Sequence, residues 1–443
     1  MANIGFISLG CAKNQVDCER MMYRLQEAGH TVCANVVDTD IVVINTCGFI
    51  DSAKSEAIDH ILQMGQLKQA GHVGKILVTG CLSQRYQQEI LKELPEVDGV
   101  LGTGSYSKIV PAVEQLLRGD RVFDFGSIDA PEEETGRVLT TPEHYAYLKI
   151  AEGCDNRCSY CVIPSLRGKF RSRQMDDVLY EARILAANGV KELIVVAQDT
   201  SRYGTDLPGN KRLLPELLTE LCKIEQLHWI RLHYLYPDEI DDALIDTIAA
   251  EPKIVKYLDI PIQHCNDKIL KLMNRRGGNA YLKELFTKLR ARIPGLVIRT
   301  SVITGLPGEG EDEFRELCEF LKEYRLERTG AFPFSPEEGT TAAEMEHVDE
   351  QIAIDRAEMV QSIQAIVMDD YNNGFLGKTL EVLVDGYDEE NEQFFGRTYA
   401  DSPDIDGRVW IASDESLTEG EFIWVCIDGI VDGELSGYVV EEL

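Results

Sequence analysis

Along the N-terminal part of the chain, short apolar runs alternate with longer amphipathic stretches. The expected strands are 3–10, 41–45 and 75–79, and the expected helices are 15–28, a stretch from Asp51 onward, and 84–93. Strands that alternate with helices in this way are typical of a parallel α/β sheet. The pattern therefore predicts an N-terminal α/β domain over residues 1–126.

The alternation resumes at Tyr145, after a polar stretch at 127–144 that is rich in Pro, Gly and acidic residues and is predicted to be a linker. The expected strands are 145–151, 192–197, 229–234, 257–262, 297–303 and 330–334. Roughly six βα units predict a partial (β/α) barrel over 145–373, with its functional face at the carboxyl ends of the strands.

The C-terminal part has a different pattern. After a helical stretch at 349–372, short β-type runs follow at 379–384, 393–398, 408–411, 421–430 and 436–440, separated by Gly, Asp and Pro. Such spacing predicts a small all-β barrel over 374–443.

Three cysteines fall within one short loop after the first strand of the central domain. Cys154, Cys158 and Cys161 have C-x-x-x-C-x-x-C spacing, between the turn-forming residues Gly153 and Pro164. A 4Fe-4S cube normally takes four thiolates, so three would leave one iron open to a small molecule. Zinc is the alternative metal, but a structural zinc site needs a fourth Cys or His nearby, and the next histidine is His228. A packed trio of cysteines without metal is the third interpretation.

Three further cysteines occupy equivalent places in the N-terminal domain. Cys11, Cys47 and Cys81 each follow an expected strand and each lie next to a glycine. Because ligands of open α/β sheets bind at the carboxyl ends of the strands, these thiols are expected to converge on a second metal or cluster site. The alternative is that each is a small buried apolar residue. The other cysteines are interpreted as structural: Cys18, Cys33, Cys222, Cys265, Cys318 and Cys426.

Polar residues follow other strands of the central domain. Gln198 and Asp199 are candidate cofactor contacts, and His264 is either a catalytic or a satisfied interior histidine. The basic run 167–173 could bind a carboxylate of a cofactor or substrate through arginine forks, or form a solvated loop.

Composition narrows the functional classes. The 443 residues have a net charge of −32, and residues 375–443 alone contain 18 acidic and 3 basic side chains. General nucleic-acid binders usually carry a basic surface, so this negative charge favours a basic partner. The alternative explanation is that the charge only keeps the protein soluble. We expect a cytoplasmic protein without a membrane span, because the chain shows neither a long apolar run nor a signal peptide. Its 12 cysteines are then reduced thiols or metal ligands.

The cysteine loop, with Tyr160 before its last cysteine, resembles the radical S-adenosylmethionine signature. Together with the three N-terminal cysteines, the partial barrel and a TRAM-like terminal barrel, the whole chain resembles the methylthiotransferases. The segments SLGCAKN at 8–14 and NTCGFID at 45–51 look like the branch that modifies an aspartate of small-subunit ribosomal protein twelve. The rival branch modifies adenosine in transfer RNA and must meet RNA, which an acidic terminal domain fits poorly. Cys18 departs from the family pattern, and its role is open.

The resemblance implies two 4Fe-4S clusters, one on Cys154, Cys158 and Cys161 and one on the N-terminal cysteines. The first would bind S-adenosylmethionine and cleave it to a 5′-deoxyadenosyl radical that removes hydrogen from the β-carbon of the aspartate. The second would carry the methylthio group. Tyr160, Gln198 and Asp199 are implied cofactor contacts by motif position.

The implied partners are the basic ribosomal protein as substrate, an electron donor, and a ribosome or assembly-factor contact. A non-catalytic iron-sulfur electron carrier or scaffold is the alternative from a different functional class. It would not cleave S-adenosylmethionine.

Overall fold

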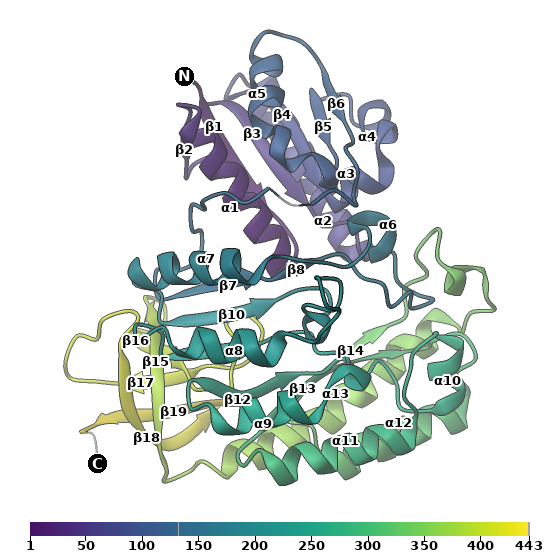
Figure 1. Cartoon of the computed structure of the whole chain (residues 1–443), viewed down its shortest axis with the longest axis vertical. Coiled ribbons are helices and arrows are strands. Elements are labelled where there is room, and N and C mark those ends of the chain that lie inside the picture. Colours follow the sequence, from purple (N-terminus) through teal and green to yellow (C-terminus); the bar gives the residue numbers. More distant parts are fainter. Residues whose placement is uncertain (132, 442–443) are drawn as a thin grey trace.

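The computed structural model describes residues 1–131 and 133–441. An N-terminal α/β unit stands above a central partial barrel, and a small β-barrel packs beside the central unit (Figure 1). The expected fold class is thereby confirmed. Among the described residues, no helix combines the length and apolar character needed to cross a membrane.

The N-terminal sheet has six parallel strands in the order β2-β1-β3-β4-β5-β6. The strands are β1 (Asn3–Ser8), β2 (Thr31–Cys33), β3 (Thr39–Thr46), β4 (Val73–Gly80), β5 (Gly99–Leu101) and β6 (Val122–Asp124). The pattern of the sequence predicted β1, β3 and β4. It missed the others because a strand of three residues is too short to show a period.

Helices cover both faces of this sheet. They are α1 (Ala12–Glu27), α2 (Asp51–Gln69), α3 (Cys81–Tyr86), α4 (Gln88–Glu93), η1 (Thr103–Lys108) and α5 (Ile109–Leu117). Helices α1 and α5 share one apolar cluster with the sheet, and α2 shares the other. The helix expected at 84–93 is split at Gln87, whose φ of 42° lies in the left-handed region.

The central sheet is also parallel, in the order β14-β13-β12-β11-β10-β7. Its strands are β7 (Tyr145–Lys149), β10 (Glu192–Val196), β11 (Trp229–Leu232), β12 (Ile254–Asp259), β13 (Val297–Thr304) and β14 (Arg328–Pro333). All six expected strands are present. Strand β12 begins and ends three residues earlier than expected. It ends before Pro261, which has no backbone N–H to donate to a neighbouring strand. A separate two-stranded pair joins β8 (Ala151–Glu152) to β9 (Arg171–Ser172).

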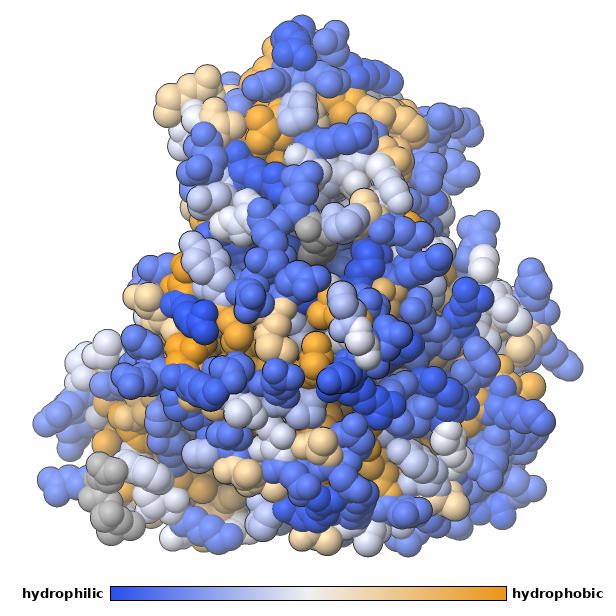
Figure 2. All heavy atoms as spheres, in the orientation of Figure 1, coloured by the Kyte–Doolittle hydropathy of each residue, from blue (hydrophilic) through white to orange (hydrophobic). Residues whose placement is uncertain are grey.

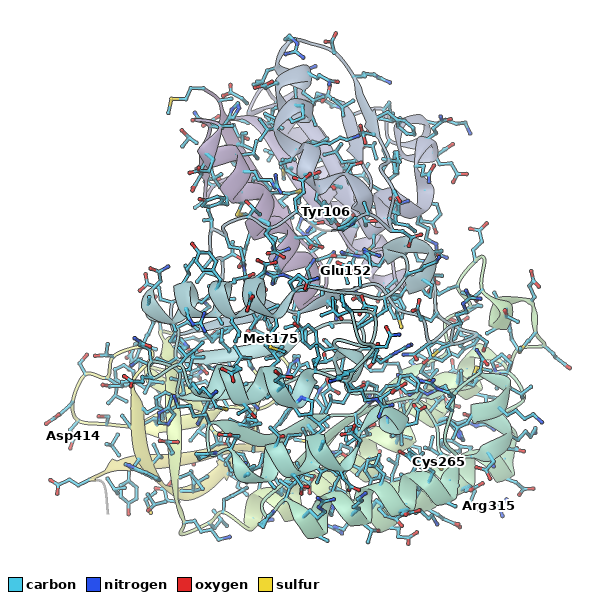
Figure 3. All side chains as sticks on the ribbon, viewed as in Figure 1. Tyr106, Glu152, Met175, Cys265, Arg315 and Asp414 are labelled. Carbon is cyan, nitrogen blue, oxygen red and sulfur yellow. The ribbon has the colours of Figure 1, made fainter. Side chains whose placement is uncertain are left out.

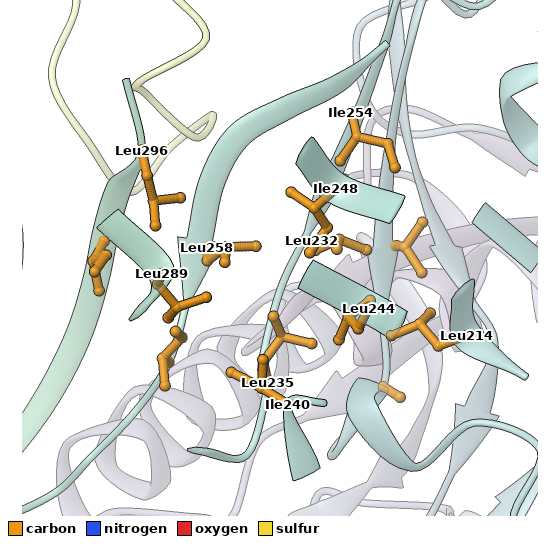
Figure 4. Packing of buried hydrophobic residues seen from close by; sticks show 14 of the residues in the cluster. Leu214, Leu232, Leu235, Ile240, Leu244, Ile248, Ile254, Leu258, Leu289 and Leu296 are labelled. Carbon is orange, nitrogen blue, oxygen red and sulfur yellow. The ribbon is translucent and has the colours of Figure 1, made fainter. Parts of the chain in front are cut away.

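The helices of the central unit are α6 (Ile163–Arg167), α7 (Met175–Ala187), η2 (Thr200–Arg202), α8 (Leu214–Cys222), η3 (Pro237–Glu239), α9 (Asp242–Ala250), α10 (Asp267–Leu272), α11 (Asn279–Arg292), α12 (Glu311–Tyr324), η4 (Thr341–Glu344) and α13 (Glu350–Asn373). Helices α7, α8, α9, α11, α12 and α13 pack on the central sheet in one apolar cluster, whereas α6 contacts α3 and η1 of the N-terminal unit. Leu232 and Leu258 of the sheet pack with Leu244 and Ile248 of α9 in the same buried cluster (Figure 4). Each such side chain contributes roughly 1.5–3 kcal/mol on burial.

The C-terminal unit is a closed five-stranded barrel. Its strands are β15 (Thr379–Asp388), β16 (Gln393–Arg397), β17 (Val409–Ala412), β18 (Phe422–Val431) and β19 (Glu434–Val440), and all five were expected. The loop after β16 contacts the central sheet: Ser402 Oγ lies 3.0 Å from His233 Nε2, and Tyr257 donates to Asp406 over 2.7 Å. The terminal barrel is therefore docked against the central sheet.

The connection predicted as a linker is held by buried polar contacts. Glu19 of α1 accepts hydrogen bonds from Arg137 Nε at 3.0 Å and from the Thr140 backbone at 2.8 Å. At its end, His144 lies 2.9 Å from Asp385 of β15. The domain boundaries at 126, 144 and 373 stay predictions. Figure 2 shows a mainly hydrophilic face with small, separated apolar groups.

Candidate functional site

The N-terminal cysteines follow three adjacent strands. Cys11 precedes α1, Cys47 follows β3, and Cys81 begins α3 directly after β4. Because β1, β3 and β4 are parallel neighbours, their carboxyl ends share one edge. Gly10 has φ of 92°, and a Cβ at this position would lie 2.7 Å from Cys47 Cβ. The glycine beside Cys11 thus permits the close approach of two of these cysteines.

Positive charge surrounds this group. Desolvation by the surrounding protein raises the pKa of the Cys11 thiol, but the charges of Lys13 and Arg167, together with hydrogen bonds from the backbone of Lys13 and Asn14, lower this pKa overall. Lys13 Nζ also lies 3.8 Å from the centroid of the Tyr234 ring. Burial raises the pKa of Cys81 to about 11, although Arg167 acts in the opposite direction. These cations would stabilise thiolate ligands at the edge of the sheet.

The loop with Cys154, Cys158 and Cys161 runs from β8 to α6 at the functional face of the partial barrel. Backbone hydrogen bonds shape it: Cys161 N–H donates to the Cys158 carbonyl over 3.0 Å, and Cys154 N–H donates to Gly168 over 3.1 Å. Burial raises the pKa of Cys154 to about 11 and also raises that of Cys161. The loop is therefore a defined turn that presents three closely spaced thiols.

Two residues beside Cys158 were not identified from the sequence. Arg275 Nη1 lies 3.7 Å from Cys158 Sγ and donates to Tyr160 Oη over 3.1 Å. Tyr236 Oη lies 3.9 Å from the same sulfur, and its ring lies 4.4 Å from the Arg275 guanidinium carbon. The one local signal was a basic pair followed by two glycines at 275–278 in an acidic protein.

The three candidate cofactor contacts lie near this loop in different settings. Tyr160 packs beside Ile269 and Met273. Gln198 donates to Glu152, while its own Oε1 is buried without a partner among the described residues. Asp199 accepts from Asn156 of the cysteine loop over 2.7 Å and from Ser201 over 2.5 Å. Burial raises the pKa of Asp199.

The basic run contains structural arginines. Arg167 is buried and its fork binds carboxylates, but these belong to Asp17 at 2.6 Å and Glu152 at 3.1 Å. The neighbouring Lys149 also contacts both carboxylates, and these two cations hold the pKa of Glu152 far below its usual range despite burial. Figure 3 shows Glu152 below Tyr106, at the junction of the two units. Arg167 is thus neither solvated nor open to an external carboxylate.

His264 is fully buried. Its Nδ1 accepts a hydrogen bond from the Asn266 backbone over 3.0 Å, and its Nε2 lies 3.3 Å from Glu309. These contacts favour the interpretation of His264 as a satisfied interior histidine over that of a catalytic one.

The thiols of the two groups are the ligand type that an iron–sulfur cluster takes. All twelve cysteines are free thiols, and in the part of the chain that is described no three Cys, His, Asp or Glu side chains are placed to hold one metal ion. In a cube each thiolate binds a different iron, so its ligands lie farther apart than those of one ion. Within each group, the thiols are close enough to disfavour one another's ionisation, as at Cys81 and Cys161.

Comparison with protein families divides the chain into three matched parts. Residues 3–102 match Uncharacterized protein family UPF0004, residues 148–321 match the Radical SAM superfamily, and residues 376–440 match the TRAM domain. Each match falls within one of the three units of the fold.

Curated relatives match over the full length. A protein of Caldanaerobacter subterraneus is 47% identical over 99% of this chain and 100% of its own length. One of Clostridioides difficile is 43% identical over 100% of both chains. Both carry the name ribosomal protein uS12 methylthiotransferase RimO.

Among solved structures, the fold is similar to the radical S-adenosylmethionine methyltransferase TsrM of Kitasatospora setae with cobalamin and a [4Fe-4S] cluster bound. The TM-score is 0.56 at 13% identity, over 77% of this chain and 76% of the other. At this identity the similarity concerns the fold alone.

Proposed function

The chain belongs to the ribosomal protein uS12 methylthiotransferase family of radical S-adenosylmethionine enzymes, and we propose that it places a methylthio group on the β-carbon of an aspartate in uS12. The protein uS12 is the small-subunit protein twelve expected from the sequence. The chain is a radical S-adenosylmethionine methylthiotransferase.

The observation that carries the proposal is a direct contact between Cys81 of the N-terminal group and the segment that follows Cys161 of the other group. Cys81 packs against Val162, which directly follows Cys161 in the chain, and against Leu166 of α6. The Nε of Arg167, on the same helix α6, lies 3.4 Å from Cys81 Sγ. A protein that only carries electrons through one cluster needs no second group of thiols beside the first.

In this proposal, Cys154, Cys158 and Cys161 hold one 4Fe-4S cluster, and Cys11, Cys47 and Cys81 hold the other. When bound, the clusters and S-adenosylmethionine supply the one-electron and radical chemistry needed to replace an unactivated hydrogen. The protein's part is to orient and to exclude water. Lys13 and Arg167 place positive charge around the N-terminal thiols, and Arg275 does the same at Cys158.

We assign contacts with S-adenosylmethionine to Tyr160, Gln198 and Asp199. The unpartnered, buried Oε1 of Gln198 is available to accept from the amino group of the cofactor. Asp199 fixes Asn156 of the cysteine loop, and each of its oxygens, which accepts one bond within the chain, can accept a second from the cofactor. Tyr160 is held in place by Arg275.

The substrate would be attracted by the acidic terminal barrel. The exposed acidic residues of its loops include Glu389, Glu390, Glu392, Asp414, Glu415 and Glu419. Opposite charge raises the rate of encounter with a basic protein such as uS12 and repels RNA. The proposal also includes an electron donor, contact with the ribosome or an assembly factor, and a cytoplasmic location.

The test is anaerobic incubation of the reconstituted, reduced protein with S-adenosylmethionine and uS12, followed by mass spectrometry. We expect uS12 to gain one methylthio group in place of one hydrogen, and fragmentation to place it on an aspartate. Reactions without reductant are the control. An unmodified uS12 together with methylthiolated transfer RNA would contradict the proposal in favour of the other branch, and failure to cleave S-adenosylmethionine would favour the electron carrier.

A further inference from the structure

Arg167 lies between the two groups of cysteines and is almost completely buried, with 3% of its surface exposed. It ends α6, the short helix that follows Cys161. Its Nη2 donates to Asn14 Oδ1, and its Nη1 donates to Asp17 and Glu152. These bonds fix the plane of the guanidinium, because a planar fork held at two nitrogens cannot rotate.

The remaining nitrogen, Nε, points at Cys81 Sγ over 3.4 Å. A charged donor at this distance stabilises a thiolate ligand more strongly than a neutral donor does. The contact joins residues 86 positions apart in the chain and comes from the central unit, whereas Cys81 belongs to the N-terminal sheet. The N-terminal thiol therefore receives its strongest local donor from the segment that carries the other three cysteines.

We propose that Arg167 is a positioning residue that sets the reduction potential of the cluster on Cys11, Cys47 and Cys81 through its hydrogen bond to Cys81. The inference rests on the proposed function, which places a cluster at these cysteines. Hydrogen bonds to cluster sulfurs and nearby positive charge favour the reduced form, which carries one more negative charge. Arg167 therefore raises the potential of this cluster.

The experiment isolates this cluster in the full chain by Cys154→Ala, Cys158→Ala and Cys161→Ala. Its midpoint potential is then measured by a dithionite titration followed by electron paramagnetic resonance, with Arg167→Gln, Arg167→Lys or Arg171→Gln added. Arg171 is the matched control, because its guanidinium donates to backbone carbonyls of Arg167 and Lys169, and within residues 1–131 and 133–441 it contacts no sulfur.

We expect Arg167→Gln to shift the potential to more negative values at unchanged iron content, Arg167→Lys to shift it less, and Arg171→Gln to leave it unchanged. Lys149 still contacts Asp17 and Glu152 in these variants, which limits the number of uncompensated buried charges. If Arg167→Gln does not fold, the midpoint potential of Arg167→Lys is compared with that of Arg171→Gln instead, since lysine keeps the charge but lacks the fixed Nε donor.

Equal potentials in the folded Arg167 and Arg171 variants would overturn the inference and leave the proposed function intact. If the parent with three alanines holds no iron after reconstitution, the proposed second cluster itself is wrong. The two failures are therefore distinguished by the iron content of the parent.

Discussion

The guanidinium of Arg85, in α3, lies 2.6 Å from the carboxylate of Glu337, in the loop after β14. Lys54 of α2 contacts the same buried carboxylate over 3.0 Å. Arg85 also donates to the backbone carbonyl of Gly48, next to Cys47, over 3.0 Å. This ion-paired group therefore fastens the edge that bears the N-terminal cysteines to the central unit.

Replacing Glu337 by Gln should destabilise the protein, because the buried guanidinium of Arg85 would lose its compensating charge, while the half-buried Lys54 would keep only the exposed Asp51. We expect the free energy of unfolding to fall by about 3 kcal/mol, measured by chemical denaturation. Glu338→Gln is the matched control, since that neighbouring side chain is exposed. Equal stability of the two variants would show that the ion-paired group does not hold the units together.

Replacing Cys47 by Ala should remove one cluster and spare the other. We expect the iron content to fall to about half, because two thiolates cannot hold a cube that needs at least three. Cleavage of S-adenosylmethionine should continue while methylthiolation of uS12 stops. Cys222→Ala, in α8, should change neither quantity. Methylthiolation by Cys47→Ala protein that lacks one cluster would contradict the two-cluster proposal.

Removing exposed negative charge from the terminal barrel should slow the binding of uS12. With Glu389, Glu390 and Glu392 all changed to Gln, we expect a several-fold lower association rate at low salt and little difference at high salt. The comparison is a variant with three exposed glutamates of another region replaced, namely Glu346, Glu350 and Glu358. Stopped-flow fluorescence with labelled uS12 measures the rates. An equal effect of both variants would mean that total charge, and not the terminal barrel, attracts the substrate.

Asp259, at the end of β12, makes stability depend on pH. Burial raises the pKa of this carboxyl to about 6, although Arg299 at 2.8 Å acts in the opposite direction. The folded state thus binds the proton more tightly than the unfolded state does. The contribution of Asp259 to the free energy of unfolding is therefore full at low pH and is lost as the pH rises through about 6. At most about 3 kcal/mol is involved.

Denaturation curves between about pH 4 and about pH 7 test this prediction, because the contribution changes between the unfolded-state pKa of about 3.9 and the folded-state pKa of about 6. In Asp259→Asn protein, which cannot ionise at this position, the free energy of unfolding should fall less over that interval than in the unchanged protein. The same pH dependence in both proteins would place the titrating group elsewhere.

Local patterns predicted much of the fold but not the pairing between distant segments. All five strands of the terminal barrel and all six of the central sheet were visible as apolar runs. The approach of Cys11, Cys47 and Cys81 to one edge followed from their equivalent positions after strands, although their role as ligands stays a prediction. Arg275 and Tyr236 were missed, because no local rule relates them to Cys158, which lies more than a hundred residues before Arg275 and in a different loop.

The sequence by itself determined the three units and the two groups of thiols, because apolar periodicity and cysteine spacing are local properties of the chain. Only the tertiary structure decided that the guanidinium of Arg167 binds Asp17, Glu152 and Cys81 and does not bind an external carboxylate. A guanidinium takes the nearest acceptors that share its buried surroundings. Which acceptors those are depends on how the N-terminal sheet and the central barrel meet.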